Sequence, residues 1–217
     1  MKKSLCSLIL SKFLVFPIFL LSVCVVSISI AQAEPSFEVL LGRLKQFDRS
    51  IDFRELRISY AETAEYNPYN ENKDVKTAMS IALEAKRFEE AFKTAETILG
   101  KNYLDLDAHL TCGFVYKELG NSERADFHDF VVRGILRSLM NSGDGKSPET
   151  AFQVISISEE YVILDLLNLM MKEQKLVGRN GHQYDVMTAA HRETKETLTV
   201  YFNIDIPFDW LNRRFGK

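Results

Sequence analysis

The stretch GFVYKELGNSERA, residues 113–125, decides the fold of this chain. It has the spacing G-x-x-Y-x-x-x-G-x-x-x-x-A, filled by Gly113, Tyr116, Gly120 and Ala125. Each residue has a mechanical reason in a pair of packed helices. A small residue fits where the next helix crosses, a glycine fits at the turn, and an alanine fits where two backbones approach most closely. We therefore expect two antiparallel helices that turn near Gly120.

A second helix pair is expected just upstream. A step of about 34 residues towards the N-terminus leads from Ala125 to Ala91 and from Glu123 to Glu89, and this repeat length is typical of tetratricopeptide-like hairpins. The segment AKRFEEAFKTAETIL, residues 85–99, fits the same frame. Two such pairs cannot bury their outer faces alone, because repeat arrays usually need about three units or caps. The segments on both sides must therefore cap them.

Two shorter helices are expected before the pairs. Apolar residues recur at helical spacing behind Ser36, and Asp52-Phe53-Arg54-Glu55 has the pattern of a capping box. The apolar stripe of the second helix continues to Ala64, and Asn67-Pro68 should end it. The first helix pair then follows, with its junction near Lys86-Arg87.

The periodicity changes in the C-terminal third. Residues 151–157 are short and rich in β-formers, and Ser158-Glu159-Glu160 should begin a helix whose apolar stripe extends to Met171. Arg179-Asn180-Gly181 lies between two strand-like runs, which is a strong hairpin signal. Residues 198–204 alternate between apolar and polar, as expected for a strand with one buried face. A last short helix is expected from about Pro207 to Arg213.

The predicted fold class is therefore α+β and mainly α. Tetratricopeptide-like antiparallel helical hairpins, residues 34–146, should be followed by a small antiparallel β-sheet with one or two helices, residues 147–217. We expect the second region to pack on the first as one globular unit.

The N-terminus has the pattern of an export signal. Lysines precede an apolar run from Phe13 to Ile30, and Ala31-Gln32-Ala33 supplies small residues at the positions that a signal peptidase reads. We expect cleavage after Ala33, which makes residues 1–33 a signal peptide and the mature protein periplasmic or secreted. The apolar run is close to the ~20 residues that cross a bilayer, so an uncleaved anchor is the alternative. Pro17 weakens a stable spanning helix.

Charge and cysteine content exclude several classes of function. Loss of the three leader lysines would change the net charge from −3 to −6, and such an acidic chain has no footprint for nucleic acid or for an anionic membrane surface. Cys112 would remain alone after cleavage, so it forms no internal disulfide and no cysteine metal cage. Its apolar helical surroundings predict a buried small side chain.

The segment NSGDGKS, residues 141–147, ends like a phosphate-binding loop. Met140 stands where such a loop needs its first glycine, and the element in front is a helix instead of a strand. We therefore expect Gly143 and Gly145 to provide turns with positive φ that end the helix. Ser142 and Asp144 stay as candidate ligand-binding residues, on a groove between the helical and β parts.

Titratable residues give only weak signals for chemistry. His109 and His128 fall where the hairpin frame brings two helices together, so they could share a metal or act as acid and base. No third ligand accompanies them. Glu159 and Glu160 resemble a catalytic carboxylate pair, but successive helical residues point in different directions and both suit a helix N-terminus. Glu160 is kept as a candidate ligand-binding residue.

Aromatic residues around Asn67 are the most suggestive candidate surface. Tyr60, Tyr66 and Tyr69 surround this residue and Pro68, and rigid aromatic rings with a polar tip suit the binding of peptide or glycan. The alternative is that the tyrosines fasten the loop to the first hairpin.

Four segments together resemble an uncharacterised family of exported bacterial proteins. They are DFRELRISYAETAEYNPY, NYLDLDAHLTCGFVYKELGNSERADFHDF, SGDGKSPETAFQVISISEEY and YDVM…VYFNI. The family is catalogued as domain of unknown function forty-nine nineteen, and the resemblance covers essentially the whole mature chain. It implies a tetratricopeptide-like helical region with a small β-containing end, and it implies no activity.

The expected function is a non-enzymatic module of the bacterial cell envelope that binds a peptide or protein partner. This expectation rests on the helical pairs and on the absence of a nucleophile or metal signature, and it includes no cofactor, no metal and no catalytic residue. The alternative is a small hydrolase or metal-dependent enzyme that uses His109 and His128.

Overall fold

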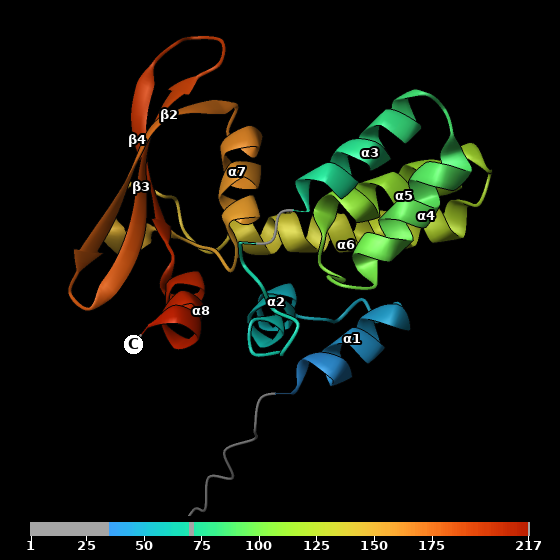
Figure 1. The fold of residues 1–217 in the computed structure, drawn as a ribbon, viewed down its shortest axis with the longest axis horizontal. Helices are drawn as coiled ribbons and strands as arrows, with labels where there is room; N and C mark the ends of the chain where they lie inside the picture. Colours follow the sequence, from blue (N-terminus) through green and yellow to red (C-terminus); the bar gives the residue numbers. More distant parts are fainter. Residues whose placement is uncertain (1–34, 70–71, 217) are drawn as a thin grey trace, which may run out of the picture. The chain divides into compact units, whose positions relative to one another are not determined.

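The computed structural model describes residues 35–69 and 72–216, so the predicted signal peptide and its cleavage site lie outside the described residues. The described residues form eight α-helices, a short 3-10 turn and four strands (Figure 1), which confirms an α+β fold that is mainly α. The helices are α1 Phe37–Lys45, α2 Phe53–Tyr60, α3 Lys73–Glu84, α4 Phe88–Leu99, α5 Leu106–Glu118, α6 Ser122–Met140, α7 Ile157–Leu166 and α8 Asp205–Phe215. The strands are β1 Phe152–Gln153, β2 Leu169–Arg179, β3 His182–His191 and β4 Thr197–Asn203.

Two helix pairs, α3 with α4 and α5 with α6, form where the spacing predicted them. Lys86 and Gly120 adopt positive φ at the two junctions, and the Asn121 side chain accepts a hydrogen bond from the Arg124 amide to cap α6. A Cβ added at Gly113 would lie 3.3 Å from the Cβ of His128. The glycine therefore allows α5 and α6 to approach closely.

Helix α6 connects the helical pairs with the C-terminal part. It contacts α5 and α2 and also α7 and β1, and Figure 1 shows it running beneath α3 and α5 towards the sheet. Val131, Ile135 and Leu139 recur every four residues and are buried in the larger core. The Phe53 ring of α2 occupies the space that a side chain at Gly134 would need.

The sheet is mixed, with the strand order β1-β4-β3-β2. Three strands form the expected antiparallel meander, whereas β1 pairs in parallel with β4, with Phe152 opposite Phe202. The prediction of a wholly antiparallel sheet is therefore wrong at this edge. The segment after α6 returns alongside β4, where the Tyr201 amide donates to the Gly145 carbonyl at 2.8 Å. The hairpin at Asn180-Gly181 is confirmed, since both residues have positive φ.

Some element boundaries differ from the sequence pattern. Helix α7 begins at Ile157 and ends at Leu166, so the predicted helical Met171 lies in β2. Asn168 adopts positive φ and turns the chain into the strand. Helix α2 ends at Tyr60, and Ala64 is exposed outside it.

The loop after α6 uses its glycines in two ways. Gly145 has a positive φ, as expected, but Gly143 does not. A Cβ at Gly143 would instead collide with the backbone of Thr150 and Ala151. Because the amides of Asp144 and Gly145 both donate to the Thr150 carbonyl, at 3.0 and 2.8 Å, the backbone closes tightly on itself here.

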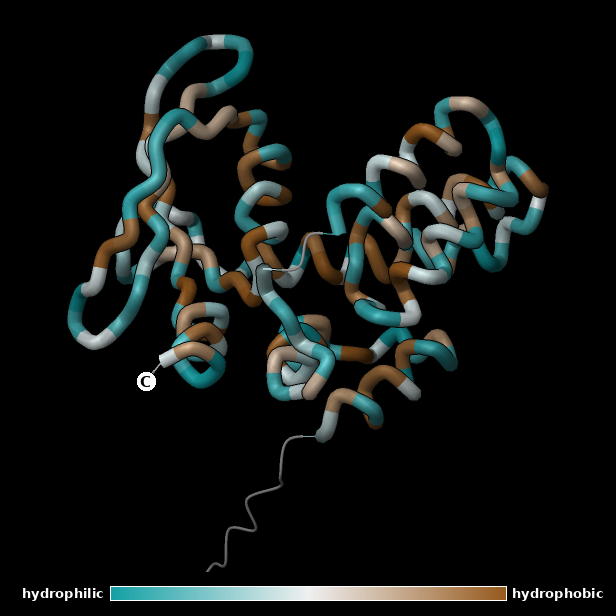
Figure 2. Tube along the Cα trace, viewed as in Figure 1, coloured by the Kyte–Doolittle hydropathy of each residue, from teal (hydrophilic) through white to brown (hydrophobic). Residues whose placement is uncertain are grey.

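Two apolar clusters stabilise the described residues. The larger one contains side chains from α1, α2, α6, α7 and the sheet, and the smaller one lies within α3, α4 and α5. Cys112 is buried in the smaller cluster, as its surroundings predicted. Hydrophobic and hydrophilic residues alternate along the paired helices (Figure 2). None of the helices in the described residues combines the length and apolar character needed to cross a bilayer.

Candidate functional site

A groove of about 860 Å³ lies between the helical pairs and α7. Helix α3 and the start of α5 contribute one wall, α7 contributes the other, and Ile135 of α6 lies among the apolar residues that line it. Figure 1 shows both α3 and α7 above α6, with α7 nearer to the sheet. The volume lies within the range of ~300–1,000 Å³ that is usual for ligand sites.

The α3 wall combines a fixed charge with an exposed apolar side chain. The Nζ of Lys76 lies 2.8 Å from Asp105 Oδ2 and 2.8 Å from Asp107 Oδ2. Burial acts against the ammonium, but the two carboxylates raise the pKa of Lys76 above its usual value, so the side chain is charged. Five residues further along α3, Ile81 is 53% exposed and lines the groove.

The α7 wall presents Tyr161, Val162 and Asp165 to the groove. Tyr161 is 41% exposed, and Asp165 forms an ion pair with Arg192. Large apolar side chains therefore remain exposed on both walls.

The predicted tyrosines divide into two groups. Tyr60 and Tyr66 line the groove together with Asn67. Both rings are buried, and burial raises the pKa of Tyr60 to about 12 and raises that of Tyr66 further, so both phenols stay protonated. Tyr69 is not among the lining residues, and its ring lies 5.9 Å from that of Trp210.

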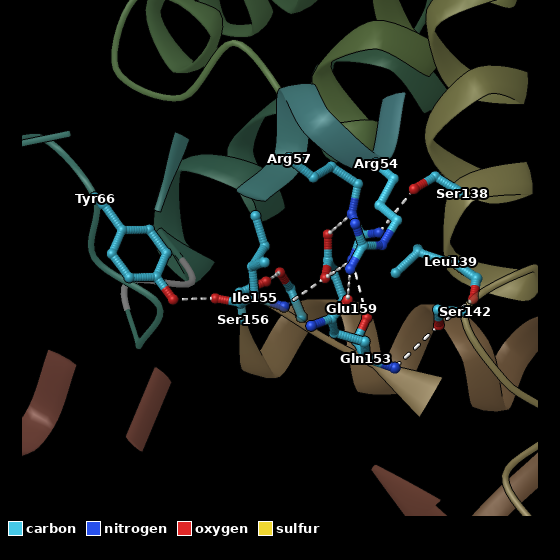
Figure 3. Close-up of polar contacts among 11 residues, drawn as sticks. Arg54, Arg57, Tyr66, Ser138, Leu139, Ser142, Gln153, Ile155, Ser156 and Glu159 are labelled. Carbon is cyan, nitrogen blue, oxygen red and sulfur yellow. Dashed lines mark hydrogen bonds and ion pairs between the residues drawn. The ribbon is translucent and has the colours of Figure 1, made fainter. Parts of the chain in front are cut away.

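Tyr66 fastens its loop to the segment before α7. Its hydroxyl donates to the Ile155 carbonyl (Figure 3). The fastening role considered from the sequence is thus present for Tyr66, but its partner is the chain before α7 instead of the first helical hairpin.

Arg57 and Glu159 form a buried ion pair that sequence reasoning missed (Figure 3). Arg57, 2% exposed, donates from Nε to Glu159 Oε1 at 2.8 Å and from Nη2 to Oε2 at 2.7 Å. Its remaining bonds reach Ser138 Oγ at 2.9 Å and the Gln153 carbonyl at 3.1 Å. Glu159 also accepts from the Ile155 amide at 2.8 Å. One side-chain network thus joins α2, α6, β1 and α7 beside the groove.

Glu160 is fully buried on the other side of α7 and does not line the groove. Burial, followed by the neighbouring Asp185 and then Glu159, raises the pKa of Glu160 to about 9. Glu159 does make a bond typical of a helix N-terminus, through the Ile155 amide. Glu160 instead faces β3. The sequence had led us to expect that both glutamates stabilise the N-terminus of this helix.

His109 and His128 lie together, as the hairpin frame predicted. Their Nδ1 atoms are 2.8 Å apart, and His109 Nε2 lies 2.8 Å from the Tyr103 carbonyl. Because His109 must donate from Nε2 to that carbonyl, its Nδ1 accepts the proton of His128 Nδ1. Burial lowers the pKa of both to about 4, so both imidazoles are neutral at pH 7.

This geometry is that of a hydrogen bond and not of a metal site. Two imidazole nitrogens bound to zinc at about 2.0 Å with a tetrahedral angle would lie about 3.3 Å apart. Within residues 35–69 and 72–216, no group of three or more histidine, cysteine or acidic side chains is placed to hold a metal ion. His128 lines a separate groove of about 790 Å³ together with Tyr116 and Arg124.

Ser142 and Asp144 lie outside the main groove. Ser142 Oγ donates to the Leu139 carbonyl at 2.6 Å and accepts from the Gln153 amide at 2.9 Å. Asp144 accepts from the Lys146 amide at 3.0 Å. Both side chains thus stabilise the loop that follows α6. This loop packs against β4, so neither residue faces α3.

The fold and the groove define an α+β protein with paired helices and a small mixed sheet, in which the groove lies between the helix pairs and α7. The chain matches the family described as Domain of unknown function (DUF4919) over residues 26–212, and it belongs to that family. No curated protein and no solved structure matches it. The tetratricopeptide-like character of the helix pairs therefore stays a prediction from the sequence.

Proposed function

We propose that the groove between α3, α5 and α7 binds an extended segment of a peptide or protein, and that this protein is a non-enzymatic binding module of the bacterial cell envelope. The location rests on the export signal that the sequence predicts for residues 1–33. The observation that carries the binding role is the exposure of Ile81 and Tyr161 on opposite walls. Exposed apolar side chains in a groove with a polar rim are typical of recognition surfaces.

The lining groups support a peptide as the ligand. Hydroxyl and amide groups of Thr77, Ser80, Asn67 and Asn102 also line the groove, and they suit the amides and carbonyls of an extended backbone. No nucleophile with an adjacent base lies among the described lining residues.

The charges of the groove favour a partner segment with basic side chains. Five carboxylates line it, but only two ammonium groups do: Glu84, Asp105, Asp107, Glu159 and Asp165 against Lys73 and Lys76. Arg57 and Arg192 offset two of the carboxylates. The remaining groups leave a small negative excess, which would attract a cationic peptide and repel an anionic one.

The test is selection of peptides from a displayed random library, followed by titration calorimetry with the best synthetic peptide. Ile81→Ser should weaken binding at least tenfold, because it removes an exposed apolar contact without touching the core. Leu119→Ser is the matched control, since Leu119 is 68% exposed and lies outside the groove. Equal affinity of the two variants, or failure to select any peptide, would contradict the proposal.

A further inference from the structure

Helix α7 is held by two neighbouring glutamates that point to different sides. Glu159 binds Arg57 beside the groove, whereas Glu160 lies against the sheet near Asp185 of β3. Successive residues of a helix are rotated by about 100°, so adjacent carboxylates meet different surroundings. The ion pair accounts for Glu159, but it leaves Glu160 unexplained.

Glu160 is 0% exposed, and neither carboxyl oxygen has a hydrogen-bond donor among the described residues. Asp185 is 5% exposed and accepts a hydrogen bond from Gln174 Nε2 of β2 at 2.6 Å. An ionised Glu160 would therefore be a second buried carboxylate with no donor of its own. Such a charge is strongly unfavourable inside a protein.

Within the described part of the chain, the ionisable groups that act on Glu160 are all acidic and add no compensating charge. Asp185 of β3 and Glu159, which precedes it on α7, both raise the pKa of Glu160, and Glu160 in turn contributes to the raised pKa of Tyr69 in the loop before α3. The guanidinium of Arg57 is already bound by Glu159. A protonated Glu160, in contrast, can donate its O–H to Asp185 and satisfy both groups.

We propose that Glu160 and Asp185 share one proton, and that this proton holds α7 against the sheet and thereby keeps the groove in its binding geometry. The consequence for binding rests on the function proposed above. Tyr161, Val162 and Asp165 follow Glu160 directly and line the groove. Loss of the proton places two carboxylates together in the interior, so α7 moves away from β3 and carries this wall with it.

The direction of the pH dependence follows from proton binding. The folded protein holds the Glu160 proton up to about pH 9, whereas the unfolded chain releases it near pH 4.5. Between these values the folded state binds more protons than the unfolded state, so stability falls as pH rises. The fall continues until the pH passes about 9, so a comparison of pH 7 with pH 9.5 covers its upper part.

The experiment measures melting temperature and carboxyl protonation over this range. We expect the melting temperature of the natural protein to fall from pH 7 to pH 9.5, and we expect Glu160→Gln to flatten this fall, since the amide donates to Asp185 at every pH. Glu173→Gln, which removes an exposed carboxylate of β2, should keep the natural profile. A flat natural profile, or a fall that Glu160→Gln leaves unchanged, would overturn the proposal.

Two further measurements keep the test decisive. The carbon-13 shift of the Glu160 carboxyl at pH 7 should be that of a protonated acid, and it needs no variant that must fold. An ionised shift would overturn the proposal. A rise in melting temperature with calcium chloride at pH 9 that Glu160→Gln abolishes would overturn it too, because the pair would then hold a cation instead of a proton.

Measuring peptide binding at two pH values distinguishes a failure of this inference from a failure of the proposed function. A selected peptide should bind the natural protein at least tenfold more weakly at pH 9.5 than at pH 7, and Glu160→Gln should retain binding at pH 9.5. If no peptide binds at any pH, the proposed function fails, while the melting profiles and the carboxyl shift still decide whether the proton is shared. If a peptide binds equally at both pH values, the link to the groove is wrong.

Discussion

At the scale of single residues, Arg57 shows how a local pattern hides a long-range role. It follows Phe53 by one helical turn and therefore lies on the buried face of α2, where an arginine is unexpected. The position of Arg57 on this apolar face could have indicated, from the sequence alone, that it has a buried acidic partner. The partner itself, Glu159, is 102 residues away and belongs to an element whose packing no helical periodicity specifies.

Removing one partner of this pair should destabilise the protein strongly. Arg57→Met leaves the Glu159 carboxylate buried without its counter-ion, and the free energy of unfolding should fall by about 3–5 kcal/mol in urea titrations. Arg87→Met is the matched control, because Arg87 pairs with Glu90 at the surface, and its effect should stay within about 0.5 kcal/mol.

The double variant Arg57→Met/Glu159→Met separates the charge from the packing. It should lose less stability than Arg57→Met, since no unpaired charge remains in the interior. A double variant less stable than the single one would show that Glu159 acts mainly through the bond that it accepts from the Ile155 amide, since both variants lack the Arg57 bonds to Ser138 and Gln153.

At the scale of elements, the helix pairs were predictable and the end of α7 was not. The turns at Lys86 and Gly120 and the close approach at Gly113 depend on residues within one hairpin, so spacing alone located them. The run from Ile163 to Met171 is apolar except for Asp165 and Asn168, and periodicity cannot separate a helix from a strand in such a run. Asn168 divides it through a backbone conformation that is fixed by the turn into β2.

The strand β1 was predicted as β-rich but not as a parallel partner of β4. Its two residues follow a loop whose amides converge on the Thr150 carbonyl, and that closure sets the direction in which the chain meets the sheet. Such a closure depends on contacts between Gly143 and the backbone opposite it. These contacts are visible only in three dimensions.

A pair of helical glycines tests the close approach of α5 and α6. Gly113→Val should lower the free energy of unfolding by about 1–3 kcal/mol, because the new side chain meets His128. Gly42→Ala in α1 should be neutral or raise stability by up to about 1 kcal/mol, since no atom lies within 4 Å of the added Cβ. Urea titrations measure both, and a tolerated Gly113→Val would contradict the packing described for this pair.

At the scale of the whole molecule, the groove combines residues of the helical region with residues of the C-terminal region, and neither region forms it alone. The helix pairs supply one wall of the groove and α7 supplies the other, while Arg57 and Glu160 hold α7 from its two sides. The sequence indicated the tyrosines and Asn67, of which Tyr60, Tyr66 and Asn67 line the groove. It could not indicate the walls, because their residues lie far apart in the sequence, as Ile81 and Tyr161 do, and no local pattern relates them.

The most direct test of the central claim is to map a selected peptide by amide chemical shifts on the isotope-labelled protein. The account predicts that the largest shifts fall in α3, in residues 102–107 and in α7, with little change around His128. Shifts centred on the groove beside His128 and Tyr116, or spread evenly over the surface, would contradict it.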